Sequence, residues 1–328
     1  MRNSKTIGGV TYGIFSGIFW AVDTVLIGIV LSMSGFLAFE QLLFVAPLLS
    51  TFLHDTFSAI WMTIYLGIKG EFKTAISSLK RKPGRIIILA GTLGGPIGMT
   101  FYVLSIHSIG SSYTAVISSI YPAVGALFAY LILRDKLRLR NWFGLIMSIT
   151  FIILLSYSGE LVVGSSASLG IIFLAICITG WGMECVVSAY AMKEDGIKPE
   201  HALLIRQYTS AIIYGTLIIP FFVGHSYTIQ IISSPIVILA LAGVALAGTL
   251  SYVFYYNAIN ILGPIRAMAM NITYAAWAVG FEAILFGTAF TWKEALFGAF
   301  IITGSILTVA EKSDSPLPPL GKESYAES

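Results

Sequence analysis

Two short sequence elements place an aromatic ring and a carboxylate inside long apolar stretches. Trp20 is followed three residues later by Asp23, and Trp181 is followed in the same way by Glu184. Residues three apart lie on the same face of a helix, so each element presents an indole and an acid in one direction. A quaternary ammonium group cannot donate a hydrogen bond, and proteins hold it with aromatic faces and negative charge. The two elements therefore predict a cavity that accepts a cation.

Further aromatic residues in the second half are candidates for additional walls of this cavity. Tyr252, Tyr255 and Tyr256 share one apolar run at helical spacing, and Tyr274 and Trp277 lie three apart in the next run. We expect these side chains to contact a ligand together with the two tryptophans. Packing between helices is the alternative role, because tyrosine and tryptophan in membrane proteins commonly serve packing or interface anchoring. The sequence leaves both roles open for the tyrosines.

Ionisable residues inside the apolar runs are candidates for a polar network. Besides the acids Asp23 and Glu184, they include His54, Asp55 and Arg206. A charged side chain is costly in hydrocarbon, and such residues usually face a polar cavity or pair with one another. The adjacent His54 and Asp55 form a candidate proton-responsive pair, because histidine titrates near neutral pH. A salt bridge that only orients helices is the alternative.

The composition predicts that membrane-spanning helices position these residues. Of 328 residues, 57% are hydrophobic and 11% are charged, and the mean hydropathy is +0.87. A soluble domain carries about 25% charged residues. The apolar runs have roughly the 18 to 25 residues that a helix needs to cross the hydrocarbon core. We predict an all-α polytopic membrane protein with ten transmembrane helices, at about 9–32, 40–68, 86–107, 113–133, 142–158, 169–192, 200–223, 235–260, 265–287 and 294–311.

The distribution of basic residues predicts the orientation of these helices. With a cytoplasmic N-terminus, the cytoplasmic loops at 69–85 and 134–140 contain six and four lysines and arginines. Four connections predicted outside contain none, namely 32–39, 108–112, 159–168 and 224–234. Lysine and arginine accumulate on the cytoplasmic side of membrane proteins. Both termini are therefore predicted in the cytoplasm, with Lys293 as the one basic residue on the opposite side.

The two halves of the chain align with each other. Tyr121 matches Tyr274 within similar apolar runs, the two tryptophan–acid elements match, and Arg206 takes the position of His54. An odd number of spans per unit inserts the second unit upside down, an arrangement of secondary transporters with a binding site near the midplane. We predict an inverted repeat of two five-helix units. The first unit is predicted at 9–158 and the second at 169–311. A disordered cytoplasmic tail is predicted at 312–328.

Several other functions are not expected from this sequence. The net charge of +3 gives no indication of a nucleic-acid partner, and without a Walker phosphate-binding loop no ATPase subunit is implied. Cys177 and Cys185 are separated by about 12 Å along one predicted helix, so they cannot pair as a disulfide. We expect no metal site, no cofactor and no enzymatic activity. The expected partners are a small cationic substrate and the lipid bilayer.

The chain resembles the EamA family of the drug/metabolite transporter superfamily. The likeness rests on two five-helix units with glycine-rich opening spans, on Tyr-Pro-Ala-Val-Gly at 121–125, and on Leu-Arg-Asp-Lys-Leu ending at 137. The family usually has glutamate where this chain has Asp135. The resemblance covers residues 9–311 and implies a ten-helix carrier that opens alternately to the two sides of the membrane.

Within this family, the chain looks most like the bacterial choline permease branch. The residues that carry the narrower likeness are His54-Asp55, the two tryptophans and the tyrosine-rich run at 252–257. The resemblance implies a secondary active transporter in the plasma (inner) membrane of a bacterium that imports choline or a similar quaternary ammonium compound. Protons are the candidate coupling ion, through Glu184, Asp23 or the His54-Asp55 pair.

Two other hypotheses stay open at this point. An exporter of amino acids or small metabolites would need a basic partner for the substrate carboxylate, and Arg206 is the arginine predicted deep inside a span. The surroundings of Arg206 therefore discriminate between a zwitterion and a cation. A non-transporting membrane sensor or scaffold is the third hypothesis, and the acids predicted inside the spans weigh against it.

Overall fold

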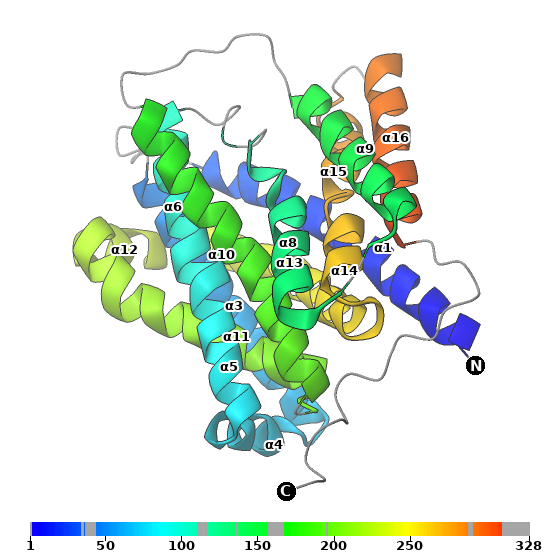
Figure 1. The fold of residues 1–328 in the computed structure, drawn as a ribbon. Coiled ribbons are helices and arrows are strands. Elements are labelled where there is room, and N and C mark those ends of the chain that lie inside the picture. Colours follow the sequence, from blue (N-terminus) through cyan, green and yellow to red (C-terminus); the bar gives the residue numbers. More distant parts are fainter. Residues whose placement is uncertain are drawn as a thin grey trace, which may run out of the picture.

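The computed structural model describes residues 2–33, 36, 44–109, 114, 117–135, 137–156, 167–194, 196–287 and 291–309. All regular secondary structure within these residues is helical, so the predicted all-α class is confirmed (Figure 1). Six segments are long and apolar enough to cross a membrane, namely Thr6–Leu31, Lys82–Ile106, Ser168–Lys193, Pro199–Val223, Pro235–Leu262 and Pro264–Phe286. The count of ten spans and the orientation stay predictions, and the predicted tail at 312–328 lies outside the described residues.

The helices follow one another in two similar series. The first half contains α1 (Arg2–Leu31), α3 (Val45–Ile68), the continuous run α5 (Lys82–Thr92), η2 (Leu93–Met99) and α6 (Thr100–Ile109), then α8 (Tyr121–Leu133) and α9 (Leu139–Ser156). The second half contains α10 (Ala167–Glu194), α11 (Pro199–Ile213) continuing into η3 (Tyr214–Val223), α13 (Pro235–Leu262), α14 (Pro264–Asn271), α15 (Tyr274–Phe286) and α16 (Trp292–Val309). Short connecting helices are α4 (Phe72–Ser77), η1 (Ser78–Lys80) and α12 (His225–Ile232).

The sequence marks where several of these helices begin and end. Proline occupies the first turn of α5, α8, α11, α13 and α14. At that position its missing amide hydrogen removes no intrahelical hydrogen bond. Gly263 separates α13 from α14 with a φ of 85°, a backbone conformation that residues with a Cβ rarely adopt. The chain can therefore turn between two helices at a single residue.

The helix contacts of the first half recur in the second half. α1 packs along α13 and against α15, while its counterpart α10 packs along η2 and α6 and against α8. The two opening helices, which carry the tryptophan–acid elements, each pack in this way against helices of the other half. α9 and α16 pack against each other as a separate pair at the upper right of Figure 1. This arrangement fits the predicted inverted repeat.

Two helices begin at the tyrosines that align in the repeat. α14 ends at Asn271 and α15 begins at Tyr274, while α8 begins at Tyr121 directly after a turn. Discontinuous helices often form the binding sites of transporters with inverted repeats. The η2 segment, which contains Gly94 and Pro96, is a π-helix, and wider turns of this kind are frequent at functional sites. The irregular segments of the fold therefore gather near the aromatic residues.

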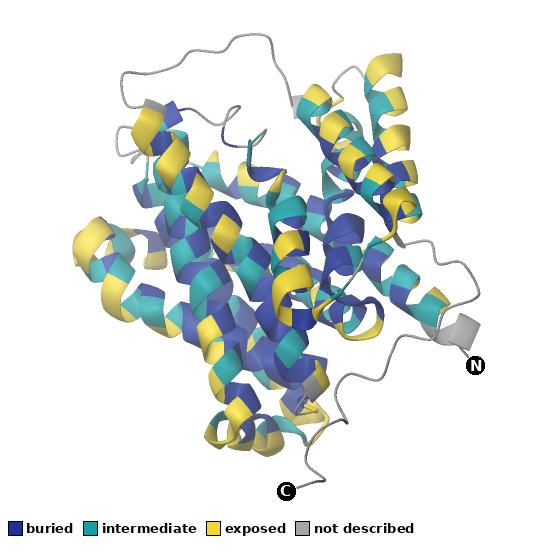
Figure 2. Cartoon of the chain, viewed as in Figure 1, coloured by how far each residue is buried: buried dark blue, intermediate teal, exposed yellow. Residues whose placement is uncertain are grey.

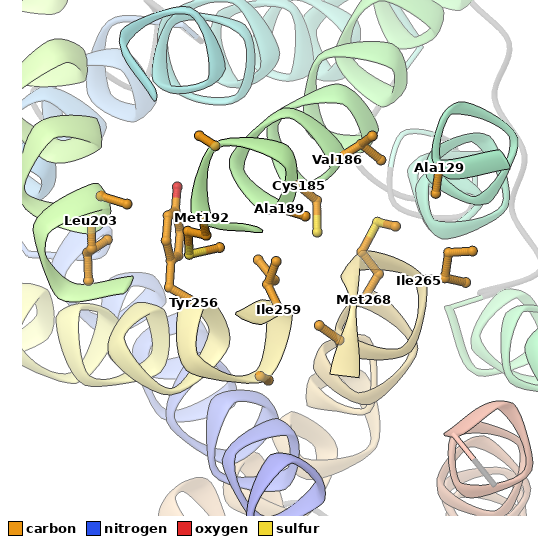
Figure 3. Close-up of a cluster of buried hydrophobic side chains, with 14 of the residues drawn as sticks. Ala129, Cys185, Val186, Ala189, Met192, Leu203, Tyr256, Ile259, Ile265 and Met268 are labelled. Carbon is orange, nitrogen blue, oxygen red and sulfur yellow. The ribbon is translucent and has the colours of Figure 1, made fainter. Parts of the chain in front are cut away.

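The main apolar core lies between α8, α10, α11, α13 and α14. Figure 3 shows side chains from these helices converging near Cys185, Tyr256 and Met268, all of which are buried. On the outer faces of α9 and α16, where Figure 2 shows many exposed positions, large apolar side chains such as Phe143 and Ile306 are exposed. Backbone groups satisfied within helices and an apolar exterior are the properties that a bilayer requires.

A polar contact connects the segment after α3 with the start of α11. Lys198 Nζ donates to Glu71 Oε1 at 2.8 Å, and His201 Nε2 lies 2.8 Å from Glu71 Oε2. The hydrogen bond from Lys198, assisted by His201, holds the pKa of the Glu71 carboxyl below its usual value. Glu71 lies in a loop predicted to be cytoplasmic, so this contact joins the two halves on that side.

Candidate functional site

Two acid–base pairs occupy equivalent positions in the two halves. In the first half, His54 Nε2 on α3 lies 2.9 Å from Asp23 Oδ1 on α1. In the second half, Arg206 Nε on α11 donates to Glu184 Oε1 on α10 at 2.8 Å. Arg206 aligns with His54, and Glu184 aligns with Asp23. Each half therefore contributes one acid from its opening helix and one base from its second helix.

Asp55 joins the two pairs into one network. Its Oδ2 accepts a hydrogen bond from Arg206 Nη1 at 3.2 Å and another from the Ser210 hydroxyl, and its Oδ1 lies 3.4 Å from His54 Nδ1. Arg206 and Asp55 are only 2% and 4% exposed. Charges buried this deeply are tolerated when they are paired and hydrogen-bonded. The five ionisable residues predicted from the sequence thus lie in one connected cluster.

The guanidinium of Arg206 is engaged by internal partners at each nitrogen. Besides Glu184 and Asp55, it donates from Nη1 to Gln207 Oε1 at 2.8 Å and from Nη2 to the Tyr252 hydroxyl at 3.1 Å. The cluster contains three carboxylates but one arginine and one histidine. The network therefore contains one more acidic than basic side chain.

Two cavities adjoin this network. The first, called here the tyrosine cavity, has a volume of about 100 Å³ and is lined by Trp20, Met99, Tyr121, Trp181, Glu184, Cys185, Ser251, Tyr252, Tyr255, Tyr256, Ile259, Asn271 and Tyr274. The second, the polar cavity, has a volume of about 240 Å³ and is lined by Trp20, Asp23, Thr24, Ile27, Ser50, Thr51, His54, Asp55, Met99, Tyr102, Trp181, Arg206, Tyr252 and Tyr274. A single water needs about 10–15 Å³ on this measure, so each cavity has room for more than one water.

The two cavities share a wall made mainly of aromatic rings. Trp20, Trp181, Tyr252 and Tyr274 line both of them, together with Met99. Because Glu184 lines the tyrosine cavity and the other ionisable residues line the polar cavity, this wall separates a mostly aromatic space from a mostly charged one. A ligand in either cavity would therefore lie beside these rings.

The indole rings are held by equivalent tyrosines in the two halves. Trp20 meets Tyr274 edge to face, with ring centroids 6.4 Å apart and planes at 81°. Trp181 meets Tyr121 in the same way, at 5.8 Å and 83°. Tyr121 and Tyr274 are the aligned residues at which α8 and α15 begin. The broken helices thus fix the orientation of both indoles through an aromatic geometry that is favourable in itself.

Close approach of glycine backbone holds each acid–base pair in place. A Cβ at Gly94 in η2 would overlap the Glu184 carboxylate, and a Cβ at Gly248 in α13 would overlap His54 Nε2. The missing glycine side chains therefore make room for the acid–base pairs themselves.

The structure separates one predicted site residue from the others. Trp277, expected to form a wall with Tyr274, packs instead beside an apolar cluster formed by Ala21, Val25 and Ala278. It lines neither cavity, whereas the other predicted site residues line at least one. Tyr274 and Trp277 both lie on α15 and both pack beside this cluster, but Trp277 lies almost one helical turn farther along the helix. The sequence spacing alone does not show where along the helix the cavity ends.

Several cavity residues were not predicted from the sequence. Tyr121, Asn271 and Ser251 line the tyrosine cavity, and Tyr102 lines the polar cavity. The alignment of Tyr121 with Tyr274 was a signal that could have identified Tyr121. Asn271 is a polar residue inside an apolar run, which is a weaker signal of the same kind. Within the described residues, no group of three or more His, Cys, Asp or Glu side chains is placed to hold a metal ion.

The chain is similar in sequence to a family of known proteins. The model of the EamA-like transporter family matches residues 7–157 and 168–310. The chain belongs to this family. It is also 34% identical over 312 residues to Protein LicB of Haemophilus influenzae, a match that covers 93% of this chain and 99% of that protein. The family resemblance predicted from the sequence is therefore confirmed.

A solved crystal structure agrees with the fold of this EamA family member. The two chains superpose with a TM-score of 0.66, at 16% identity, over 94% of this chain and 96% of the other. A likeness at this identity supports the fold alone. Family membership makes the chain a multi-pass membrane transporter, which is not a class of enzyme. The sensor or scaffold hypothesis has no comparable support.

Proposed function

We propose that this EamA family member is a secondary active transporter of choline or a similar quaternary ammonium compound, working by alternating access. The observation that carries the proposal is the composition of the tyrosine cavity. Aromatic rings from both halves surround it, and its one carboxylate, Glu184, belongs to a network with more acidic than basic side chains. Such a space suits a cation that has no hydrogen-bond donor on its charged group.

The number of available rings is sufficient for useful affinity. Each aromatic face contributes about 0.5–2 kcal/mol to the binding of a desolvated cation. Three or four faces and a nearby carboxylate therefore supply about 8 kcal/mol, which corresponds to a micromolar dissociation constant. Trp20, Trp181, Tyr252 and Tyr274 are the candidate faces, because they line both cavities. The proposed substrate is held where the two halves meet, as expected for an inverted repeat.

The surroundings of Arg206 favour a cation over an amino acid. A zwitterionic substrate needs a partner for its carboxylate, and this role would fall to Arg206. All three of its nitrogens already donate to internal acceptors, two of which are carboxyl groups. To bind a substrate carboxylate, the protein would have to break buried ion pairs, and leaving a buried charge unpaired costs about 3–5 kcal/mol. The amino-acid exporter is therefore the less favoured alternative.

The network offers a route for proton coupling, which is part of this proposal. Glu184 is balanced by Arg206 and also accepts a hydrogen bond from Tyr256 at 3.2 Å. His54 instead lies between Asp23 and Asp55, so gain or loss of its proton changes the charge facing the polar cavity. We assign the coupling proton to the Asp23–His54 pair. Glu184 is the carboxylate that pairs with the positive charge of the substrate. Import is the proposed direction, on the basis of the resemblance to choline permeases.

Transport by purified protein in liposomes tests this proposal. Labelled choline is expected to accumulate when the outside is more acidic than the inside, and excess tetramethylammonium should compete with it. Alanine and other amino acids should not compete. His54→Gln is expected to abolish accumulation driven by the pH gradient while choline exchange continues, since exchange requires no net proton movement. Accumulation of amino acids without choline transport would establish the alternative function.

A further inference from the structure

One end of the tyrosine cavity carries neutral polar groups rather than charges. Ser251 on α13 and Asn271 at the end of α14 line this cavity together with Tyr121 on α8. Both Ser251 and Asn271 contact Ser16, a fully buried residue of α1. Three helices therefore meet at Ser16, and two polar side chains extend from this point to the cavity.

The hydrogen bonds at Ser16 determine what these side chains present to a ligand. The Ser251 hydroxyl donates its one proton to the Ser16 carbonyl oxygen at 2.8 Å. The Asn271 amide nitrogen donates to the Ser16 hydroxyl oxygen at 2.7 Å. The Ser251 proton and one of the two Asn271 amide protons are thus engaged, while Ser251 Oγ and Asn271 Oδ1 retain acceptor capacity. The Tyr121 hydroxyl lies 3.5 Å from Asn271 Oδ1, at the limit of a hydrogen bond, so this oxygen is weakly satisfied.

We propose that Asn271 and Ser251 accept a hydrogen bond from a hydroxyl group of the substrate, so that the transported compound is a quaternary ammonium alcohol. The inference rests on the proposed function, because the aromatic rings and Glu184 hold the cationic end in the same cavity. A substrate hydroxyl can donate to Asn271 Oδ1, whose hydrogen bond from the Tyr121 hydroxyl is long at 3.5 Å. Asn271 and Ser251 are then specificity-determining residues, and Ser16 is a positioning residue that fixes both.

This arrangement makes a chemical prediction about related compounds. An ether or ester in place of the hydroxyl has no donor and leaves both protein acceptors unpaired. A carboxylate in that place, as in a betaine, presents further acceptors and a negative charge in a cavity that contains Glu184. The cavity should thus select the alcohol among trimethylammonium compounds.

The test compares choline with its methyl ether, (2-methoxyethyl)trimethylammonium, by titration calorimetry on the purified full-length protein. The two ligands share their charge and nearly their shape, and differ in the donor. Wild-type protein is expected to bind choline about three- to ten-fold more tightly, as one hydrogen bond typically contributes. Asn271→Leu should reduce this ratio to less than about two, mainly through weaker choline binding. Ser251→Ala should give a smaller reduction in the same direction.

Asn257→Leu is the matched control, because Asn257 lies on α13, lines neither cavity and donates to the Val253 carbonyl oxygen of its own helix. It should leave the ratio unchanged. An unchanged ratio in Asn271→Leu, or equal binding of the two ligands by the wild type, would overturn the inference and leave the proposed function intact. The wild-type ratio and Ser251→Ala decide the question if Asn271→Leu does not fold. Failure of the wild type to bind either ligand would instead reject the proposed function itself.

Discussion

Arg206 and Glu184 form a buried ion pair, with Nε and Oε1 2.8 Å apart, that repeats the contact between His54 and Asp23 in the other half of the chain. An inverted repeat brings equivalent residues together around the centre of the protein. Here it brings together two acid–base pairs that differ in their basic residue. Arginine stays charged at all physiological pH values, whereas histidine changes charge near neutrality. The arginine pair is suited to hold Glu184 beside the substrate cavity, and the histidine pair is suited to a role in coupling.

Removal of Arg206 should destabilise the protein strongly. Arg206→Gln would leave the Glu184 and Asp55 carboxylates buried without their cationic partner, at a cost of about 3–5 kcal/mol. We expect a lower thermal midpoint in detergent, measured by fluorescence-detected size exclusion. Arg206→Lys should recover little of the lost stability, because one ammonium group cannot replace the several donors of a planar guanidinium. Glu184→Gln added to Arg206→Gln should restore part of the lost stability. A midpoint like the wild type in Arg206→Gln would show that the network is not needed for folding.

Each indole should contribute separately to ligand binding. Trp20→Ala and Trp181→Ala are expected to weaken choline binding by about 1–2 kcal/mol each, roughly ten-fold, because each removes a desolvated aromatic face. Phenylalanine at either position should retain part of the affinity. Trp292→Ala is the control, because Trp292 is 78% exposed and lines neither cavity. Titration calorimetry measures all of these variants. Unchanged affinity in both alanine variants would assign the indoles to packing.

A methyl group at Gly94 should disrupt the site at the Glu184 carboxylate. Gly94→Ala places a Cβ against the Glu184 carboxylate, and overpacking of this kind typically costs about 1–3 kcal/mol. We expect reduced choline uptake and a lower thermal midpoint. Gly243→Ala is the matched control within a helix, since a Cβ there meets no atom within 4 Å. Equal behaviour of the two variants would contradict the proposed contact between η2 and Glu184.

The contact between Glu71 and α11 should depend on pH in acid. The pKa of Glu71 is lowered in the folded protein, so its contribution to stability is present above the unfolded pKa of about 4.3. It is lost as the pH falls through the lower folded value. Glu71→Gln should therefore lower the thermal midpoint at pH 7, and its difference from the wild type should shrink as the pH falls toward 3. A difference that stays constant over this range would exclude an ionic contribution.

Periodicity and the internal repeat were sufficient to predict much of the candidate site. The spacing of Trp20 with Asp23 and of Trp181 with Glu184 determines which side chains share a helix face, and such local geometry can be read from the sequence. Their partners depend on how separate helices cross. That Glu184 meets Arg206, and that Asp55 contacts both bases, therefore followed only from the fold.

The extent of the cavity along a helix could not be predicted from spacing alone. Tyr274 and Trp277 both lie on α15 and both pack beside Ala21, Val25 and Ala278, but only Tyr274 lines the cavity. A break between α14, which ends at Asn271, and α15, which begins at Tyr274, places two cavity residues at helix ends. Neither proline nor glycine marks this break, so the sequence contains no strong signal for it.

The most direct test of the central claim compares choline with its uncharged carbon isostere, 3,3-dimethylbutan-1-ol, in titrations of the purified wild-type protein. The two molecules share shape and hydroxyl group, and differ in the positive charge. If aromatic faces and the negative network recognise a cation, choline should bind with a dissociation constant on the order of micromolar and the isostere at least about a hundred-fold more weakly. Comparable binding of the two molecules, or binding of neither, would contradict the claim that this cavity recognises a quaternary ammonium group.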